Sequence, residues 1–129
     1  MLGNPNKICS YVVRVDSGAA PNPFWGCCTL AICTPNHQRA DLHKGDWIVG
    51  TTPKDFGSKF LYLMELEEKP LSLDQYFVDP RFEQKKPQLK PEDDQRERVC
   101  GDNFYRLVNG SLEHTGAASP ICSRLEARR

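Results

Sequence analysis

The sequence predicts a small α+β protein, mostly β, that folds as a partly closed β-barrel with one or two short helices. Three observations support this prediction. Short runs rich in β-branched and aromatic residues recur between turn signals. Asn109-Gly110 stands between two such runs, which is a strong signal for a type I′ hairpin turn. Ser72 and Gln75 form a capping-box pair, which predicts the start of a helix.

The first half of the chain is expected to supply most of the strands. These strands are predicted at residues 9–16, 27–33, 46–51 and 60–69. The second of them, CCTLAIC, is almost continuously apolar, as in a strand that is buried on both faces. A polar crossing over residues 34–46 ends in the turn pair Gly45-Asp46, where the Asp46 carboxylate is expected to accept from backbone amides.

The second half combines one helix, one hairpin and two polar segments. The helix that follows Ser72 should end before Pro80, because the residue preceding a proline avoids the helical region. Residues 83–98 contain almost no apolar residue and two prolines, which predicts a solvated, mobile connection. After the hairpin, residues 116–129 are expected to form a weakly structured basic tail.

Length and charge narrow the classes of protein to consider. A chain of 129 residues is expected to form a single domain over residues 1–129. Its 17 basic and 17 acidic residues provide no overall positive field for holding duplex nucleic acid. The sequence has no apolar run of the ~20 residues that a membrane span needs, and no secretion-signal layout. We therefore expect a cytoplasmic protein, without a membrane partner, whose six cysteines are reduced.

Four segments of the chain resemble one known family. They are SYVVRVDSGAAPNPFWGCCTLAICTP, GDWIVGT, LYLMEL followed by DPRF and KKP, and CGDNFY. Together they resemble the nucleotide-modification-associated domain family, second type, of bacteria and their phages, over residues 9–105. The resemblance implies a role in DNA base modification or phage–host conflict, inside a bacterial or phage-infected cell. Family members continue beyond the last segment with apolar strand sequence, whereas this chain ends in SRLEARR, so its closing strand is either degenerate or truncated.

The order strand, GDW, strand is also similar to the barrels of the PUA, ASCH and EVE group. By analogy of layout, this similarity implies a pocket that holds RNA or a modified base. Because a fold alone does not determine function, the function has to be inferred from individual residues.

The loop PNPFW is the main candidate for binding a ligand. Pro21 and Pro23 each fix a φ angle, which lowers the entropy lost when the loop orders around a ligand. Phe24 and Trp25 offer aromatic faces, and stacking of a base on an aromatic ring is worth about 1–3 kcal/mol. The Asn22 amide offers both a donor and an acceptor for the edge of a base. The alternative is that the two rings only plug one end of the barrel.

Other ligand contacts are expected from polar and aromatic residues near the ends of strands. They are Asp16, Trp47, Thr51, Asp102, Asn103 and Tyr105. Trp47 and Thr51 would line the pocket wall opposite Trp25, although a turn followed by a core tryptophan explains GDW equally well. The cluster CGDNFY suits hydrogen bonding to a ligand, and it also suits a plain turn. Lys85 and Lys86 are candidates for contacting a phosphate, and a solvated lysine pair is the alternative.

Signals for catalysis or for a cofactor are few. Asp102 and Asp16 are the candidate general bases, but neither has a partner that the sequence positions beside it. No Walker loop, GxGxxG, HExxH or GxSxG motif occurs, so no cofactor is indicated. A zinc site is disfavoured because the adjacent Cys27 and Cys28 would point to opposite faces of a strand.

These observations favour a binding module over an enzyme. The hypothesis is a small barrel that holds a nucleotide or a modified nucleobase, either free or within DNA or RNA. One alternative is an enzyme that acts on nucleotides or modified bases. Another is a phage-type sponge that sequesters a nucleotide signal. The sequence leaves the oligomeric state open, a dimer included.

Overall fold

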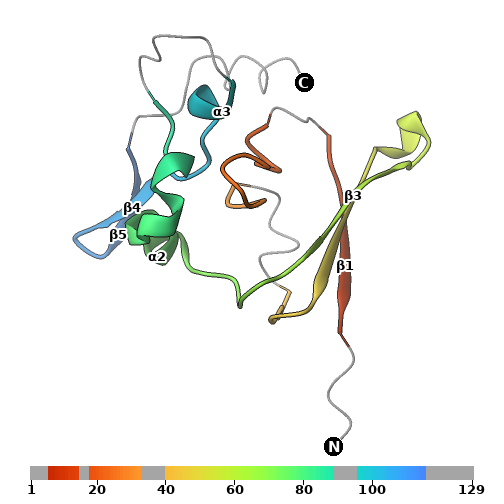
Figure 1. Cartoon of the computed structure of the whole chain (residues 1–129), viewed down its shortest axis with the longest axis horizontal. Helices are drawn as coiled ribbons and strands as arrows, with labels where there is room; N and C mark the ends of the chain where they lie inside the picture. Colours follow the sequence, from red (N-terminus) through yellow and green to blue (C-terminus); the bar gives the residue numbers. More distant parts are fainter. Residues whose placement is uncertain (1–5, 15–17, 33–39, 89–95, 116–129) are drawn as a thin grey trace, which may run out of the picture. The chain divides into compact units, whose positions relative to one another are not determined.

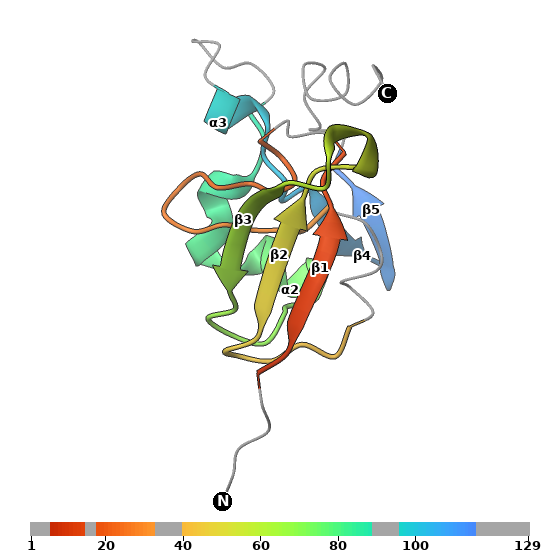
Figure 2. The same ribbon diagram turned by 90° about the vertical axis from the view of Figure 1, so that its right-hand side faces the viewer.

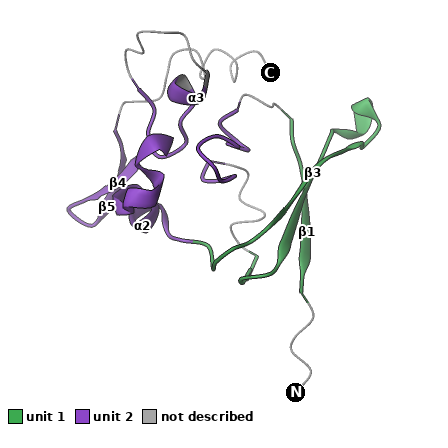
Figure 3. Ribbon diagram, viewed as in Figure 1, with its two compact units in different colours: residues 1–14, 34–70 green, residues 15–33, 71–129 purple. Residues whose placement is uncertain are grey.

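The chain divides into two compact units. The computed structural model describes residues 6–14, 18–32, 40–88 and 96–115. Unit 1 comprises residues 1–14 and 34–70, and unit 2 comprises residues 15–33 and 71–129 (Figure 3). The single domain expected from the chain length therefore stays a prediction.

Unit 1 contains a three-stranded sheet. Its strands are β1 (Ile8–Val12), β2 (Trp47–Thr51) and β3 (Phe60–Glu65), and β2 lies in the middle (Figure 2). β1 runs parallel to β2, and β3 runs antiparallel to it. A short 3-10 turn, η1 (Lys54–Phe56), lies between β2 and β3. The strands predicted within residues 9–16, 46–51 and 60–69 are thus confirmed, each shorter than its apolar pattern.

The two faces of this sheet differ in exposure. Ile8 is 71% exposed, whereas Tyr11 and Ile48 are buried. Gly50 pairs with Tyr11 on one side and with Tyr62 on the other, and a Cβ at Gly50 would collide with the Tyr62 ring. The absent side chain leaves room for the Tyr62 ring, whose hydroxyl is hydrogen-bonded to the hydroxyl of Tyr11. Glycine therefore has a packing role at this strand position.

Asp46 holds the turn that precedes β2. Its Oδ1 accepts from the backbone amide of Lys7 at 2.9 Å, and its Oδ2 accepts from the amide of His43 at 2.8 Å. The bond from the Lys7 amide, followed by that from His43, lowers the pKa of the Asp46 carboxyl. The predicted bonding of backbone amides by this carboxylate is confirmed.

Unit 2 contains a capped helix. α2 (Leu73–Val78) packs against β4 (Tyr105–Val108) (Figure 1). The Ser72 hydroxyl accepts from the Gln75 amide at 3.4 Å, and the Gln75 side chain accepts from the Ser72 amide at 3.1 Å. The predicted capping box is therefore confirmed, as is the end of the helix before Pro80.

Unit 2 continues with a second helical segment and a hairpin. The 3-10 helix η2 (Pro80–Lys85) follows α2, and the short helix α3 (Arg96–Val99) comes later in the chain. β4 pairs antiparallel with β5 (Ser111–His114). The linking residues Asn109 and Gly110 have φ angles of 49° and 80°, as the predicted type I′ turn requires.

One prediction about secondary structure is wrong, and one about solvent exposure is wrong at two residues. Residues 27–32, the described part of the strand expected at 27–33, form no strand, and only an isolated bridge joins Asn22 to Thr29. Ile32, at the end of this run, packs against the buried residues Ala19 and Cys100. Within the expected solvated connection over 83–98, Lys85 and Pro87 are instead buried.

The fold class is confirmed as α+β with mostly strands. Among the described residues, one sheet has three strands and the other has two, and each is open, so a barrel is not confirmed. None of the helices in these residues has the length and apolar character needed to cross a membrane. The tail at 116–129 and residues 89–95 lie outside the described residues.

The expectation of reduced cysteines is wrong at one position. Cys100 is disulfide-bonded, whereas Cys9 and Cys27 carry free thiols. Reasoning from composition failed here because pairing depends on which residues the fold brings together.

Candidate functional site

The candidate site is built on a tight loop in unit 2. Asn22 and Thr29 exchange two backbone hydrogen bonds, each 2.9 Å long, which close the base of the loop. At its tip, Trp25 and Gly26 both have positive φ angles, 64° and 81°. Positive φ at two successive residues is what a type I′ turn requires, so the chain reverses at Trp25-Gly26.

The two aromatic residues of the loop differ in exposure. Trp25 is 36% exposed, and its Nε1 donates to the Glu97 carbonyl in α3 at 3.3 Å. Phe24 is half-buried. The indole is therefore held in place through its polar edge while part of it remains accessible.

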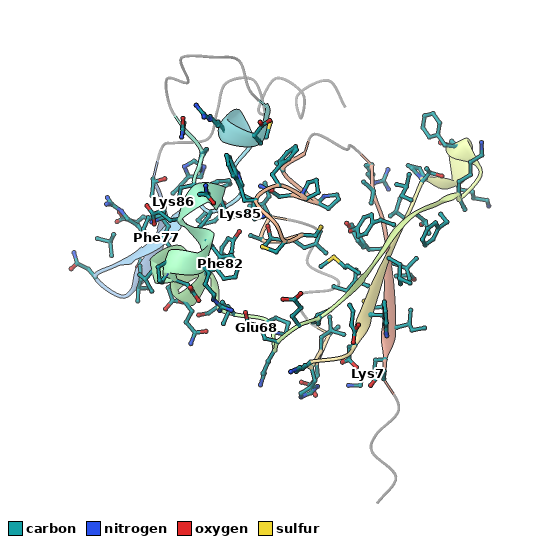
Figure 4. The ribbon with its side chains drawn as sticks, viewed as in Figure 1. Lys7, Glu68, Phe77, Phe82, Lys85 and Lys86 are labelled. Carbon is teal, nitrogen blue, oxygen red and sulfur yellow. The ribbon has the colours of Figure 1, made fainter. Side chains whose placement is uncertain are left out.

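Lys85, at the end of η2, is buried beneath this loop. Its side chain is among the largest fully buried ones, with the residue 1% exposed. The Nζ donates to Asn22 O at 2.9 Å, to Asn22 Oδ1 at 3.1 Å and to Cys27 O at 2.6 Å (Figure 4). Desolvation lowers the pKa of Lys85, and the negative charge of Asp102 opposes that shift.

The Asn22 side chain connects this lysine to the rest of the loop. It is fully buried, and its Oδ1 accepts from the Phe24 amide at 3.2 Å as well as from Lys85. Its Nδ2 donates to the Cys100 carbonyl at 3.4 Å. Both ends of the amide that was expected to read a ligand edge therefore contact protein groups.

Asp102 lies in the same buried cluster, 1% exposed. Its Oδ2 accepts from the Thr29 hydroxyl at 2.6 Å, and its Oδ1 accepts from the Tyr76 hydroxyl at 2.7 Å. Desolvation raises the pKa of Asp102, although these hydrogen bonds and the Lys85 charge oppose the shift. Desolvation, together with the nearby Asp102 charge, also raises the pKa of Tyr76.

Asn103 joins the cluster to α2 and η2. Its Nδ2 donates to the carbonyls of Tyr76 at 3.2 Å and Phe82 at 3.0 Å, and its backbone amide donates to the Lys85 carbonyl at 3.1 Å. Its Oδ1 is buried and has no hydrogen-bond partner among the described residues. Tyr105, the next candidate, is half-buried and meets the His114 ring edge-on.

The remaining candidates lie elsewhere. Trp47 and Thr51 are half-buried in β2 of unit 1, so the wall they were expected to form opposite Trp25 stays a prediction. Lys86 pairs with Glu83 Oε2 at 2.6 Å, and its Nζ lies 4.2 Å from the centre of the Phe77 ring (Figure 4). Asp16 lies outside the described residues.

Sequence reasoning missed two members of the buried cluster, Thr29 and Tyr76. Each is remote from Asp102 in the chain, and no local motif links them to it. Among the described residues, no group of three or more histidine, cysteine or acidic side chains is placed to hold a metal ion.

Residues 5–121 match the model of the family described as nucleotide modification associated domain 2. No curated protein and no solved structure matches the chain. The matched range contains the loop at 22–29, Lys85 and the segment from Asp102 to Tyr105.

Proposed function

Because the chain belongs to the nucleotide modification associated domain 2 family, we propose that it binds a nucleotide or a modified nucleobase on the loop of residues 22–29. The Trp25 indole would stack on the flat ring, and Phe24 would border it. This binding would serve DNA base modification or phage–host conflict. The proposal includes a barrel layout like that of PUA, ASCH and EVE domains.

The partial exposure of Trp25 on an anchored turn is the observation that carries this proposal. An indole already held in one place loses little conformational entropy when a ligand stacks on it. The two backbone bonds between Asn22 and Thr29 and the bond to Glu97 provide that order before any ligand arrives. If the ligand is a base within a duplex, stacking would offset the few kcal/mol needed to flip it out.

The buried polar residues support the loop in this proposal. Asn22 and Asp102 have their polar atoms bonded to protein groups, so they shape the site from beneath. The Oδ1 of Asn103 is an acceptor that the described residues leave open. A phosphate would be met by Lys86, whose ammonium has further donors beside its bond to Glu83, since the three donors of Lys85 are already in use.

Thermal-shift screening tests the proposal directly. The probes are free nucleosides, nucleotides, cyclic dinucleotides and oligonucleotides with modified bases. A probe at 100 times its Kd should stabilise the protein by about 2.7 kcal/mol. Replacing Trp25 with alanine should then weaken binding about 5- to 150-fold, the equivalent of a 1–3 kcal/mol stacking loss. Phe56→Ala, at an exposed aromatic residue outside the proposed site, is the control for loss of a ring, and equal binding by W25A and the wild type would overturn the proposal.

An enzyme is the second candidate, because the pKa values of Asp102, Lys85 and Tyr76 are all perturbed within one cluster. Such clustering is common in catalytic sites, and it also occurs in structural networks. Asp102→Asn separates the two candidates. An enzyme that uses this carboxylate should bind the identified ligand but lose turnover, whereas a binder should show only a change in Kd. A sponge would release its ligand chemically unchanged.

A further inference from the structure

The ammonium of Lys85 contacts both sides of the turn that carries Trp25. We infer that Lys85 is a positioning residue, whose buried side chain fixes the Trp25-Gly26 turn through contacts with Asn22 and Cys27. The inference concerns the loop on which the proposed function rests. Its tests need no ligand, so its failure can be distinguished from a failure of that function.

The hydrogen-bonding capacity of this ammonium matches its surroundings. A lysine ammonium has three N–H donors and no acceptor. The three acceptors are two oxygens of Asn22, before the turn, and the carbonyl of Cys27, after it. One side chain thus joins the two arms of the loop, in addition to the backbone bridge between Asn22 and Thr29.

The contact extends to the residue next to Trp25. Asn22 Oδ1 accepts from the Phe24 amide at 3.2 Å and from Lys85 Nζ at 3.1 Å. The same oxygen therefore couples the lysine to the backbone that leads into the turn. Removal of the ammonium would leave the Phe24 amide as the remaining donor to Asn22 Oδ1 and would take the Lys85 donor away from Cys27 O, and the loss of such hydrogen bonds is costly.

The position of Lys85 is itself fixed by close backbone packing. A Cβ at Gly101 would collide with the Lys85 carbonyl oxygen and with the backbone of Lys86 and Pro87. The Asn103 amide donates to that same Lys85 carbonyl. Because glycine allows this approach, the lysine extends from an anchored backbone.

The charge of Lys85 has a buried counterpart. The negative charge of Asp102 favours the charged form of the lysine. A buried charge is stable only when it is paired and hydrogen-bonded. The three acceptors provide the hydrogen bonds, and the Asp102 charge opposes the effect of desolvation on the ammonium.

Acrylamide quenching of Trp25 fluorescence tests the role of Lys85. All variants carry Trp47→Phe, so that only Trp25 emits. Lys85→Met keeps a flexible apolar chain but removes the charge and the donors, and it should increase the quenching constant of Trp25. Lys86→Met is the matched control, because that lysine pairs with Glu83, and it should leave quenching at the parent value. Equal quenching in K85M and the parent would overturn the inference.

A conservative replacement adds a test of geometry. Lys85→Arg keeps the charge, but a planar guanidinium cannot direct three donors from one atom to three converging oxygens. We expect K85R to show increased quenching as well. Protection of Trp25 in K85R equal to that in the parent protein would contradict the three-point contact.

A measurement on the wild-type protein tests the contact of Lys85 even if the variants do not fold. In a protein labelled with ¹⁵N-lysine, one side-chain ammonium should give a slowly exchanging signal, because Lys85 is buried and fully hydrogen-bonded. Lys86→Met should retain this signal. Rapid solvent exchange of every lysine ammonium would show that Lys85 does not form the contact.

Discussion

The hydroxyl of Tyr76 donates to the Asp102 carboxylate across 2.7 Å, and both residues are buried. Tyr76 is the buried residue of α2, and Asp102 comes shortly before β4, against which that helix packs. This contact therefore connects α2 to the segment that contains Asp102, which belongs to the same buried cluster as Lys85.

Tyr76→Phe should destabilise the protein by about 1–3 kcal/mol, the usual cost of leaving a buried polar group short of a partner. The ring is retained, so the loss reports the hydroxyl and not the packing. Loss of this donor should also raise the pKa of Asp102 further. Urea unfolding gives the free energy, and Val78→Ala, at an exposed position of the same helix, should stay within about 0.5 kcal/mol of the wild type. Equal stabilities of Y76F and V78A would contradict this prediction.

Gly101→Ala should destabilise the protein more than Gly50→Ala. Both new methyl groups meet occupied space, but at Gly50 the obstacle is the Tyr62 ring, which can shift, whereas at Gly101 it is backbone. Overpacking typically costs about 1–3 kcal/mol, and we place G50A within that range and G101A at or above its upper end.

Thermal and urea unfolding rank these two glycine variants. A separate readout is the slowly exchanging Lys85 ammonium, which G101A should abolish and G50A should preserve. If G101A were as stable as the wild type, the close packing around Lys85 would be wrong.

Features determined by neighbouring residues could be predicted from the sequence. The capping box at Ser72 and the turn at Asn109-Gly110 each depend on residues within one turn of chain, and both are confirmed. The bond from the His43 amide to Asp46 follows from the same kind of local chemistry, whereas the bond from the Lys7 amide spans 39 positions and has no local signal. The three strands described in unit 1 were also identified, because alternating apolar residues reflect a sheet that is buried on one face.

Features that depend on distant contacts could not be predicted. Asp102 meets Tyr76 across 26 positions and Thr29 across 73, and no sequence pattern links them. The QKKP segment looks solvated because its residues are polar, and only the fold reveals that converging oxygens surround Lys85. The loop at 27–32 resembled a strand because apolar composition does not show whether a partner strand is present.

Ser72→Ala should destabilise unit 2 by about 1 kcal/mol, within the 0.5–2 kcal/mol range of lost helix caps. The variant removes the acceptor for the Gln75 amide and breaks the capping box. Hydrogen exchange should show reduced protection of the amides in α2, while those of the β4–β5 hairpin change less. Ser111→Ala, at an exposed strand position, is the control and should keep the α2 amides protected. If S111A lost this protection and S72A did not, the role of the cap would be refuted.

Asp46→Asn should remove part of the acid sensitivity of the protein. The hydrogen bonds from Lys7 and His43 hold the pKa of Asp46 below its ordinary value of 3.8 in the folded state. The unfolded chain therefore binds a proton more readily than the folded one. This carboxylate contributes stability that is fully present above pH 3.8 and is lost as the pH falls through the lowered folded pKa.

An asparagine amide can accept through only one of its two polar atoms, so D46N should be less stable at neutral pH and lose less stability on acidification. Unfolding curves from neutral pH to below 3.8 measure both effects, with the exposed Asp55→Asn as the control that should follow the wild-type profile. If D46N lost as much stability on acidification as the wild type, Asp46 would not contribute to the acid sensitivity of the protein.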